Sequence, residues 1–266
     1  VNVFRRKPLE VVVGRAADAG VAILARVPLA SGLLSGKYDE STTFAADAIG
    51  SLTPIDYGDV CLNADIGWFK AHKLAVPEAL EDLVKPEFKD LLVVENPASS
   101  SPGLAFLAAT VGAKGDPGYL DYWKALKANG VKVVKGWTEA YTVEFSGSSG
   151  KGDRPLVVSY SSSPAYEPAT EALIRTCFRQ VEYAGVLNGA QNEVGARKFV
   201  DFMLSTQVQT EIPEQMYMYP VDATVQLPTG WREHAAVVDA PIQVPVDQLA
   251  AGRDAWIKAW TAAVIG

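Results

Sequence analysis

The sequence predicts an α/β fold, because apolar strand-like runs alternate with helical segments along most of the chain. Residues 89–97 (KDLLVVENP) and 155–164 (PLVVSYSSSP) are typical of buried strands, and each leads into a Ser-rich turn and a proline. Residues 118–130 place Tyr, Trp and Leu side chains at helical spacing and end at a glycine. With 266 residues, 48% hydrophobic and 21% charged, the chain is long enough for one large or two modest domains.

The expected elements begin with a βαβ unit in residues 1–44. Pro8 is a plausible first residue of its helix, and Gly20 is a plausible stop before the strand 21–29. Later strands are predicted at 53–63, 89–97, 131–137, from 155 onward and at 178–187. Later helices are predicted at 76–84, from 101 onward, at 118–130, 138–145, 192–213 and 245–264, with a loop at 146–154 and an extended stretch at 217–221.

The charge distribution excludes some classes of partner. The formal net charge is −7, and no run of Lys and Arg is long enough to follow a phosphate backbone, so we expect no nucleic-acid partner. The longest apolar stretches have the length of strands, so no membrane-spanning helix is expected. The first residues, VNVFRRKPLE, lack an apolar core followed by small residues, so we expect the signal of an exported protein not to be part of this sequence.

The sequence has few residues suited to metal binding or acid–base catalysis. The chain has two histidines, His72 and His234, and two cysteines, Cys61 and Cys177, which are too few and too far apart for a zinc site. We therefore expect no metal, no cofactor, no catalytic residues and no enzymatic activity, although carboxylates could still perform acid–base chemistry.

Hydroxyl and aromatic side chains gather near the predicted strand ends. Ser101 as N-cap with Pro102 in first position would leave free backbone N–H groups at a Ser-rich turn, which favours an anion. Trp137, Tyr141 and Tyr160 lie near strand ends, where ring faces attract cations. The sequence therefore suits a small ligand that is partly flat and cationic and partly anionic. The alternatives are that the serines only cap a helix and that the rings, Tyr141 above all, only pack in the core.

The N-terminal residues resemble a known enzyme family. NVFRRKP and PLASGLLSGKY (28–38) are similar to a segment of the aldo-keto reductases. The resemblance implies a late βαβ piece of a TIM barrel, whose turn contacts the phosphates of NADPH, without the catalytic Asp, Tyr, Lys and His of that family. We interpret residues 1–47 as a structural piece that makes the chain chimera-like, and an NADPH-dependent reductase-related protein remains an alternative.

The larger part of the chain resembles a different family. PIDYGDV, NPASSSPGLAFL, KGWTEAYTVEF, SYSSSPAY and KFVDFMLS occur in the order found in the thiamine-binding solute receptors of ABC importers, over about residues 53–266. The resemblance implies an α/β, two-lobed periplasmic binding protein fold of type II, with an incomplete first lobe completed by residues 1–47. It assigns 48–62 to lobe 1 and the first hinge strand, 63–174 to lobe 2, and 175–266 to the second hinge strand and the return to lobe 1.

The same resemblance implies which residues bind and what they bind. The implied ligand is thiamine or a thiamine phosphate, delivered to an ABC transporter permease by a monomer at a periplasmic or extracytoplasmic location. Ser100 and Ser101 would hold its hydroxyethyl or phosphate end, while Trp137, Tyr160 and Tyr166 would enclose it and Tyr217 would offer a stacking face. The remaining alternative is a fusion that folds without binding.

The two cysteines admit two interpretations in such a receptor. Strands that cross between lobes lie side by side in this class, and Cys61 and Cys177 fall in the inferred crossing strands YGDVCLN and TCFRQVEY. A disulfide between them would pin the hinge and suit an extracytoplasmic protein. Two buried free thiols are the alternative, and the sequence does not separate them.

Overall fold

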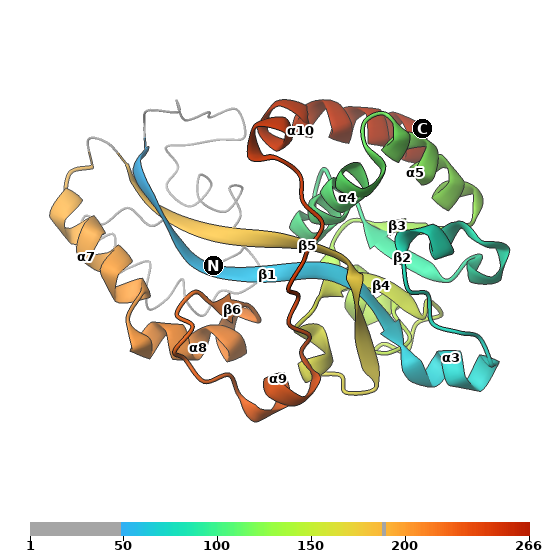
Figure 1. Ribbon diagram of the computed structural model, residues 1–266, viewed down its shortest axis with the longest axis horizontal. Helices are drawn as coiled ribbons and strands as arrows, with labels where there is room; N and C mark the ends of the chain where they lie inside the picture. The colour runs from blue at the N-terminus through green and yellow to red at the C-terminus, as the bar shows by residue number, and fades with distance from the viewer. Residues whose placement is uncertain (1–48, 188–189) are drawn as a thin grey trace. The chain divides into compact units, whose positions relative to one another are not determined.

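The computed structural model describes residues 49–187 and 190–266, and these form two compact units (Figure 1). Of the described residues, unit 1 contains 49–57, 181–187 and 190–226, and unit 2 contains Gly58–Gln180 and Leu227–Gly266. The chain passes between the units within β1 (Ile49–Asp65), within β5 (Thr170–Leu187) and again after Gln226. The reductase-like segment predicted at residues 1–47 lies outside the described residues.

The sheet is mixed, with the strand order β3-β2-β4-β1-β5. In unit 2, β2 (Leu92–Glu95) runs parallel to both β3 (Lys132–Val134) and β4 (Leu156–Tyr160). β1 is antiparallel to β4, with Val60 opposite Tyr160. Leu92 and Val94 face one core cluster and Val93 faces another, so β2 is covered on both faces, as its continuous apolar run predicts.

Helices α4 (Ser101–Lys114), α5 (Gly118–Ala128) and α10 (Val246–Trp260) lie on one side of this sheet in unit 2 (Figure 1). Edge-to-face aromatic contacts join them, because Trp123 lies 5.7 Å from Phe106 and 5.3 Å from Trp260 between ring centroids. Trp123 Nε1 also donates to Thr110 Oγ1 at 2.9 Å, so its one polar atom is satisfied in the core. The remaining helices of unit 2 are α3 (Ile66–His72), α6 (Trp137–Glu139) and α9 (Thr229–His234), with short 3-10 turns at Leu80–Val84, Pro86–Phe88 and Ser163–Ala165 and π turns at Ala140–Glu144 and Thr261–Ile265.

The apolar spacing of α5 and α10 is confirmed by burial. Tyr119, Tyr122, Trp123 and Leu126 are all buried on α5, and the helix gives way to a turn before Gly130, which has φ +79°. Trp256 and Trp260 are buried on α10. Residues 227–266 cluster with unit 2, and Trp260 packs on Trp123 there.

Unit 1 is described here by itself. Its helices α7 (Glu193–Met203) and α8 (Thr206–Met216) divide the predicted helical region 192–213 at Ser205, the N-cap of α8. Strand β6 (Tyr219–Pro220) pairs antiparallel with β1, and the rings of Tyr57 and Tyr219 stack at 5.3 Å. The buried Gln209 ties these pieces together, because its Nε2 donates to Ile55 O at 3.0 Å and its Oε1 accepts from Asp222 N at 3.1 Å.

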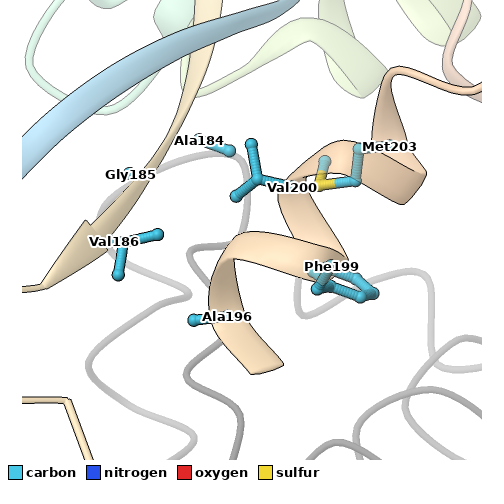
Figure 2. Close-up of a pocket in the computed structure, with 7 residues that line it drawn as sticks. All are labelled: Ala184, Gly185, Val186, Ala196, Phe199, Val200 and Met203. Atoms are coloured by element: carbon cyan, nitrogen blue, oxygen red, sulfur yellow. The ribbon is translucent and has the colours of Figure 1, made fainter. Parts of the chain in front are cut away.

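A small apolar pocket lies in unit 1 between α7 and β5. Figure 2 shows side chains of α7 directed toward β5, and the lining residues are Ala184, Gly185, Val186, Ala196, Phe199, Val200 and Met203. No side chain in that lining carries a charge or a hydrogen-bonding group able to orient a polar ligand. The pocket is therefore a packing space and not our candidate site.

Candidate functional site

The candidate site is the edge of unit 2 where β2, β3 and β4 end. Because these strands are parallel, their carboxyl ends, Glu95, Val134 and Tyr160, meet at one edge. The turn after β2 is tied to the end of β3, since Asn96 N donates to Val134 O at 2.9 Å and Ser99 Oγ donates to Lys135 O at 2.7 Å. This is the edge at which open α/β sheets bind ligands.

The Ser-rich turn begins α4 one residue earlier than predicted. Ser100, not Ser101, is the N-cap, and its Oγ accepts a hydrogen bond from Gly103 N at 3.3 Å. The run of serines offers several equivalent caps, and packing selects among them. A Cβ on Gly103 would lie 2.5 Å from the carbonyl oxygen of Glu95, so Gly103 must lie in the first turn against that carbonyl. Ser101 then becomes the first helical residue, and Pro102 the second.

The start of α4 has the electrostatic character of an anion site. Its first turn contains no acidic residue, and Ser100 and Ser101 are both half-buried. Most N–H groups of the turn are already engaged, because Pro102 has none, Gly103 N donates to Ser100 Oγ and Leu104 N donates to Ser100 O. The Ser101 N–H and the positive end of the helix dipole are what the turn can offer an anion.

Trp137 is the first residue of α6 and is held in place from two directions. Its ring stacks on Tyr141, with centroids 4.8 Å apart and planes 12° from parallel. Its Nε1 donates to Ser159 Oγ at 2.8 Å, and Ser159 Oγ in turn lies 2.7 Å from Ser163 Oγ. Tyr141 is buried, in agreement with a packing role, whereas Trp137 is only half-buried. A fixed, partly exposed indole is preorganised for a flat ligand.

The predicted tyrosines occupy different surroundings. Tyr160 is half-buried at the last position of β4. Tyr166 follows the 3-10 turn after β4, is 44% exposed, and accepts a hydrogen bond at its hydroxyl from Trp231 Nε1 at 3.0 Å. Tyr217 lies in unit 1, where it is the left-handed C-cap of α8 (φ 61°) and is 38% exposed. The structure therefore brings Ser100, Ser101, Trp137, Tyr160 and Tyr166 into unit 2 and places Tyr217 in unit 1.

Glu95 is a residue that sequence reasoning missed. It is the last residue of β2, is 0% exposed, and neither of its carboxylate oxygens has a hydrogen-bond partner among the described residues. Burial away from compensating groups raises the pKa of its carboxyl to about 8. The signal in the sequence was a lone acidic residue at the end of the apolar run LLVVE. Ser161 shows a related feature, because its buried Oγ also lacks a described partner.

Cys61 and Cys177 are joined by a disulfide between β1 and β5 within unit 2. The sequence left open a disulfide or two buried free thiols, and the structure has the disulfide. An ion pair lies close by in sequence, because Arg179 donates from Nε and Nη2 to the Asp59 carboxylate, each at 2.9 Å. Arg179 also donates to Val238 O at 2.7 Å, so the loop before α10 is attached at the same place.

The rest of the described chain offers weaker sites. Within residues 49–187 and 190–266, no cluster of three or more His, Cys, Asp or Glu could hold a metal ion. No helix in that part of the chain is long and apolar enough to cross a membrane. An open groove of about 980 Å³ borders the first half of β5, with Lys70, Glu78, Arg175 and Glu233 in its lining. Its charges have both signs, and none of its lining side chains is a buried polar group without a partner.

Comparison with known proteins decides the family. The family model described as "Bacterial extracellular solute-binding protein" matches residues 33–240. The chain belongs to this family. Solute-binding proteins of this kind capture ligands and are not enzymes, in agreement with the expectation from the sequence.

Several relatives of this solute-binding protein are named for thiamine. It is 34% identical to the thiamine-binding periplasmic protein of Salmonella typhimurium over 222 residues, which cover 80% of this chain and 64% of that protein. It is 32% identical to the Escherichia coli protein of the same name, over 83% of this chain and 68% of that protein. The Brucella suis protein of that name is 30% identical over 92% of this chain and 80% of its own length.

Solved structures confirm the predicted α/β periplasmic binding protein fold. A periplasmic thiamin binding protein matches with a TM-score of 0.69 at 28% identity, covering 95% of this chain and 75% of its own. A Bordetella ferric binding protein matches with a TM-score of 0.63 at 16% identity over 92% of this chain, which shows the fold alone.

The predicted chimera is not borne out. The solute-binding family model begins to match at residue 33, inside the segment that we interpreted as reductase-like, so the predicted join at residues 47–48 does not coincide with the start of the family match.

Proposed function

We propose that this solute-binding protein captures thiamine or a thiamine phosphate ester outside the cytoplasm and delivers it to the permease of an ABC importer. The observation that carries this proposal is the pairing of the serine turn at the N-terminus of α4, Ser100–Ser101, with a fixed indole, Trp137, at one edge of unit 2. Thiamine has matching parts, a permanently cationic thiazolium ring and a hydroxyethyl or phosphate tail. The names of the relatives support the same ligand.

The tail of the ligand would bind at the start of α4. The backbone N–H of Ser101, the first helical residue, can donate to a hydroxyl or phosphate oxygen, and no acidic side chain in the first turn repels it. The hydroxyls of Ser100 and Ser101 can add hydrogen bonds of their own. A phosphate ester would gain more than the free alcohol, because charge-assisted hydrogen bonds are the stronger ones.

The cationic ring would bind against aromatic faces. Trp137 is already positioned by Tyr141 and Ser159, so little conformational entropy is lost when a ligand ring stacks on it. Tyr160 and Tyr166 follow β4 at the same edge and are proposed to enclose the ring. Each well-placed aromatic residue can contribute about 0.5–2 kcal/mol toward a cation.

Tyr217 remains a proposed ligand residue on the strength of the family resemblance. It is 38% exposed in unit 1, so its ring has surface to offer. We also expect the protein to act as a monomer, and gel filtration with light scattering would test this expectation.

Isothermal titration calorimetry with thiamine tests the proposal directly. We expect saturable binding at a stoichiometry of one ligand per chain. An absence of heat at millimolar ligand, from protein whose circular dichroism shows it to be folded, would overturn the proposed ligand. Delivery is tested separately, by asking whether the loaded protein stimulates ATP hydrolysis by its partner transporter in proteoliposomes.

A matched pair of Trp variants locates the ring site. Trp137→Leu removes the proposed stacking face, and we expect it to weaken thiamine binding by about 3- to 30-fold, as the loss of one cation–π contact implies. Trp68→Leu is the control, because Trp68 is also half-buried and stacked, on His72 at 3.8 Å, but belongs to α3. Equal losses in both variants would contradict the assignment of Trp137.

A further inference from the structure

Burial of Glu95 destabilises the fold, and no hydrogen bond within the described chain offsets this. Its carboxyl is fully buried at the end of β2, and neither oxygen accepts or donates a hydrogen bond among the described residues. Burying such a group unpaired costs about 1–3 kcal/mol or more, whereas an apolar side chain of similar size would avoid the cost. Unsatisfied buried groups of this kind concentrate at functional sites.

Glu95 lies next to both parts of the proposed site, the aromatic residues and the serine turn. Alternation along β2 puts its side chain on the same face as Val93, and that face carries the cluster that contains Tyr141 and against which Trp137 packs. Its backbone carbonyl is approached by Gly103 in the first turn of α4. The carboxyl therefore lies beside the aromatic half of the site. Directly after Glu95, the chain enters the serine turn.

The carboxyl has no neighbouring charge to hold it ionised. On β3, α6, the π turn, β4 and α4, which adjoin this end of β2, the titratable side chains are Lys132, Lys135, Glu139, Tyr141, Glu144, Tyr160 and Lys114. Lys132 is paired with Glu144, Lys114 with Glu81, and the exposed Glu139 accepts from Lys135 N at 3.3 Å. None of them hydrogen-bonds to the Glu95 carboxyl among the described residues.

We propose that Glu95 determines specificity between the free and the phosphorylated ligand. While its buried carboxyl is uncharged, it does not oppose an anionic ligand tail at the serine turn. Once the carboxyl is ionised in alkaline solution, it repels that tail. This inference rests on the proposed function. Burial raises the pKa of the carboxyl to about 8, so the group is mostly neutral at neutral pH and ionises just above it. Ionisation would repel a phosphate at Ser100–Ser101 and attract the cationic ring, so the two ligands respond in opposite directions.

The ratio of two dissociation constants tests this inference. Calorimetry with thiamine and with thiamine monophosphate gives the ratio at about pH 7 and at about pH 9, and we expect the ester to lose about tenfold relative to thiamine across that range. The second ionisation of a phosphate monoester lies near pH 6, so the ester itself changes little within the range. The ratio cancels general effects of pH on the protein.

Two variants assign the change to Glu95. In Glu95→Gln we expect the ratio to be constant with pH, and Glu95→Met gives the same comparison with an apolar side chain if the amide is not tolerated. Glu139→Gln removes an exposed carboxylate at the same edge, and we expect it to keep the wild-type pH dependence. A constant ratio in the wild type, or an unchanged dependence in Glu95→Gln, would overturn the inference while the proposed function stands. Binding of neither ligand at either pH would overturn both.

Discussion

At the scale of single residues, Glu95 shows how a ligand-binding protein departs from the rules of core packing. The strand before it is apolar, and an apolar residue at its position would be the more stable choice. A carboxyl whose pKa is raised by burial binds a proton more tightly in the folded than in the unfolded state. Folding stability must therefore depend on pH through this residue.

We predict that stability falls as pH rises from about 4.5, the ordinary pKa of the carboxyl, to about 8, its raised value. In that window the unfolded chain releases the proton that the folded chain keeps, and outside it this contribution is constant. At about 1.4 kcal/mol per pKa unit, the full loss is about 5 kcal/mol. Urea unfolding of wild type and Glu95→Gln at about pH 5 and about pH 8.5 measures it, and an equal pH dependence in both proteins would contradict the prediction.

Sequence patterns predicted some site residues and not others for a physical reason. Ser101 and Trp137 follow predicted strands, so local pattern was sufficient to propose them, whereas Ser100 was proposed from the family resemblance. The carboxyl of Glu95 is fully buried and has no partner among the described residues, and both properties arise only in the folded chain. The choice of Ser100 instead of Ser101 as the N-cap of α4 is likewise a property of the folded chain.

At the scale of elements, the start of α4 depends on a close approach between helix and strand. Gly103 lies in the first turn of α4 against the carbonyl of Glu95, with no room for a methyl group. This contact sets the height at which the serine turn lies above the sheet edge. The position of the proposed anion site is therefore determined by one glycine.

We predict that Gly103→Ala lowers the free energy of unfolding by about 1–3 kcal/mol, because the new methyl would lie 2.5 Å from a backbone oxygen that cannot rotate away. Gly118→Ala is the matched control at the first position of α5, where an added Cβ would have its nearest neighbour at 3.9 Å. This control should be neutral or stabilising, by about 0.5–1 kcal/mol, as expected for alanine in a helix. Thermal and urea unfolding of both variants give the comparison, and equal effects would show that the close approach is not limiting.

At the scale of the whole molecule, the sequence predicted the types of the elements better than it predicted how they group together. Strand and helix types were predicted well where periodicity was strong, as in α5 and α10. The grouping of residues 227–266 with unit 2 depends on Trp260 meeting Trp123, a contact between residues far apart in the sequence that no local pattern encodes. The reductase-like interpretation of residues 1–47 is not borne out, because the match to the solute-binding family begins at residue 33.

The disulfide between Cys61 and Cys177 is the longest covalent constraint on unit 2, because its ends are 116 residues apart in the sequence. Closing so long a loop restricts the unfolded chain, and the loop-entropy relation predicts a stabilisation of about 3–5 kcal/mol. We predict that Cys61→Ala/Cys177→Ala lowers the free energy of unfolding by that amount, measured by urea unfolding without reductant. Adding dithiothreitol should destabilise the wild type to a similar extent and leave the double variant unchanged, because only the wild type has a bond to reduce. If the variant matched the oxidised wild type in stability, the disulfide would not be what limits the unfolded ensemble, and the Asp59–Arg179 pair that also links β1 to β5 would become the candidate to test.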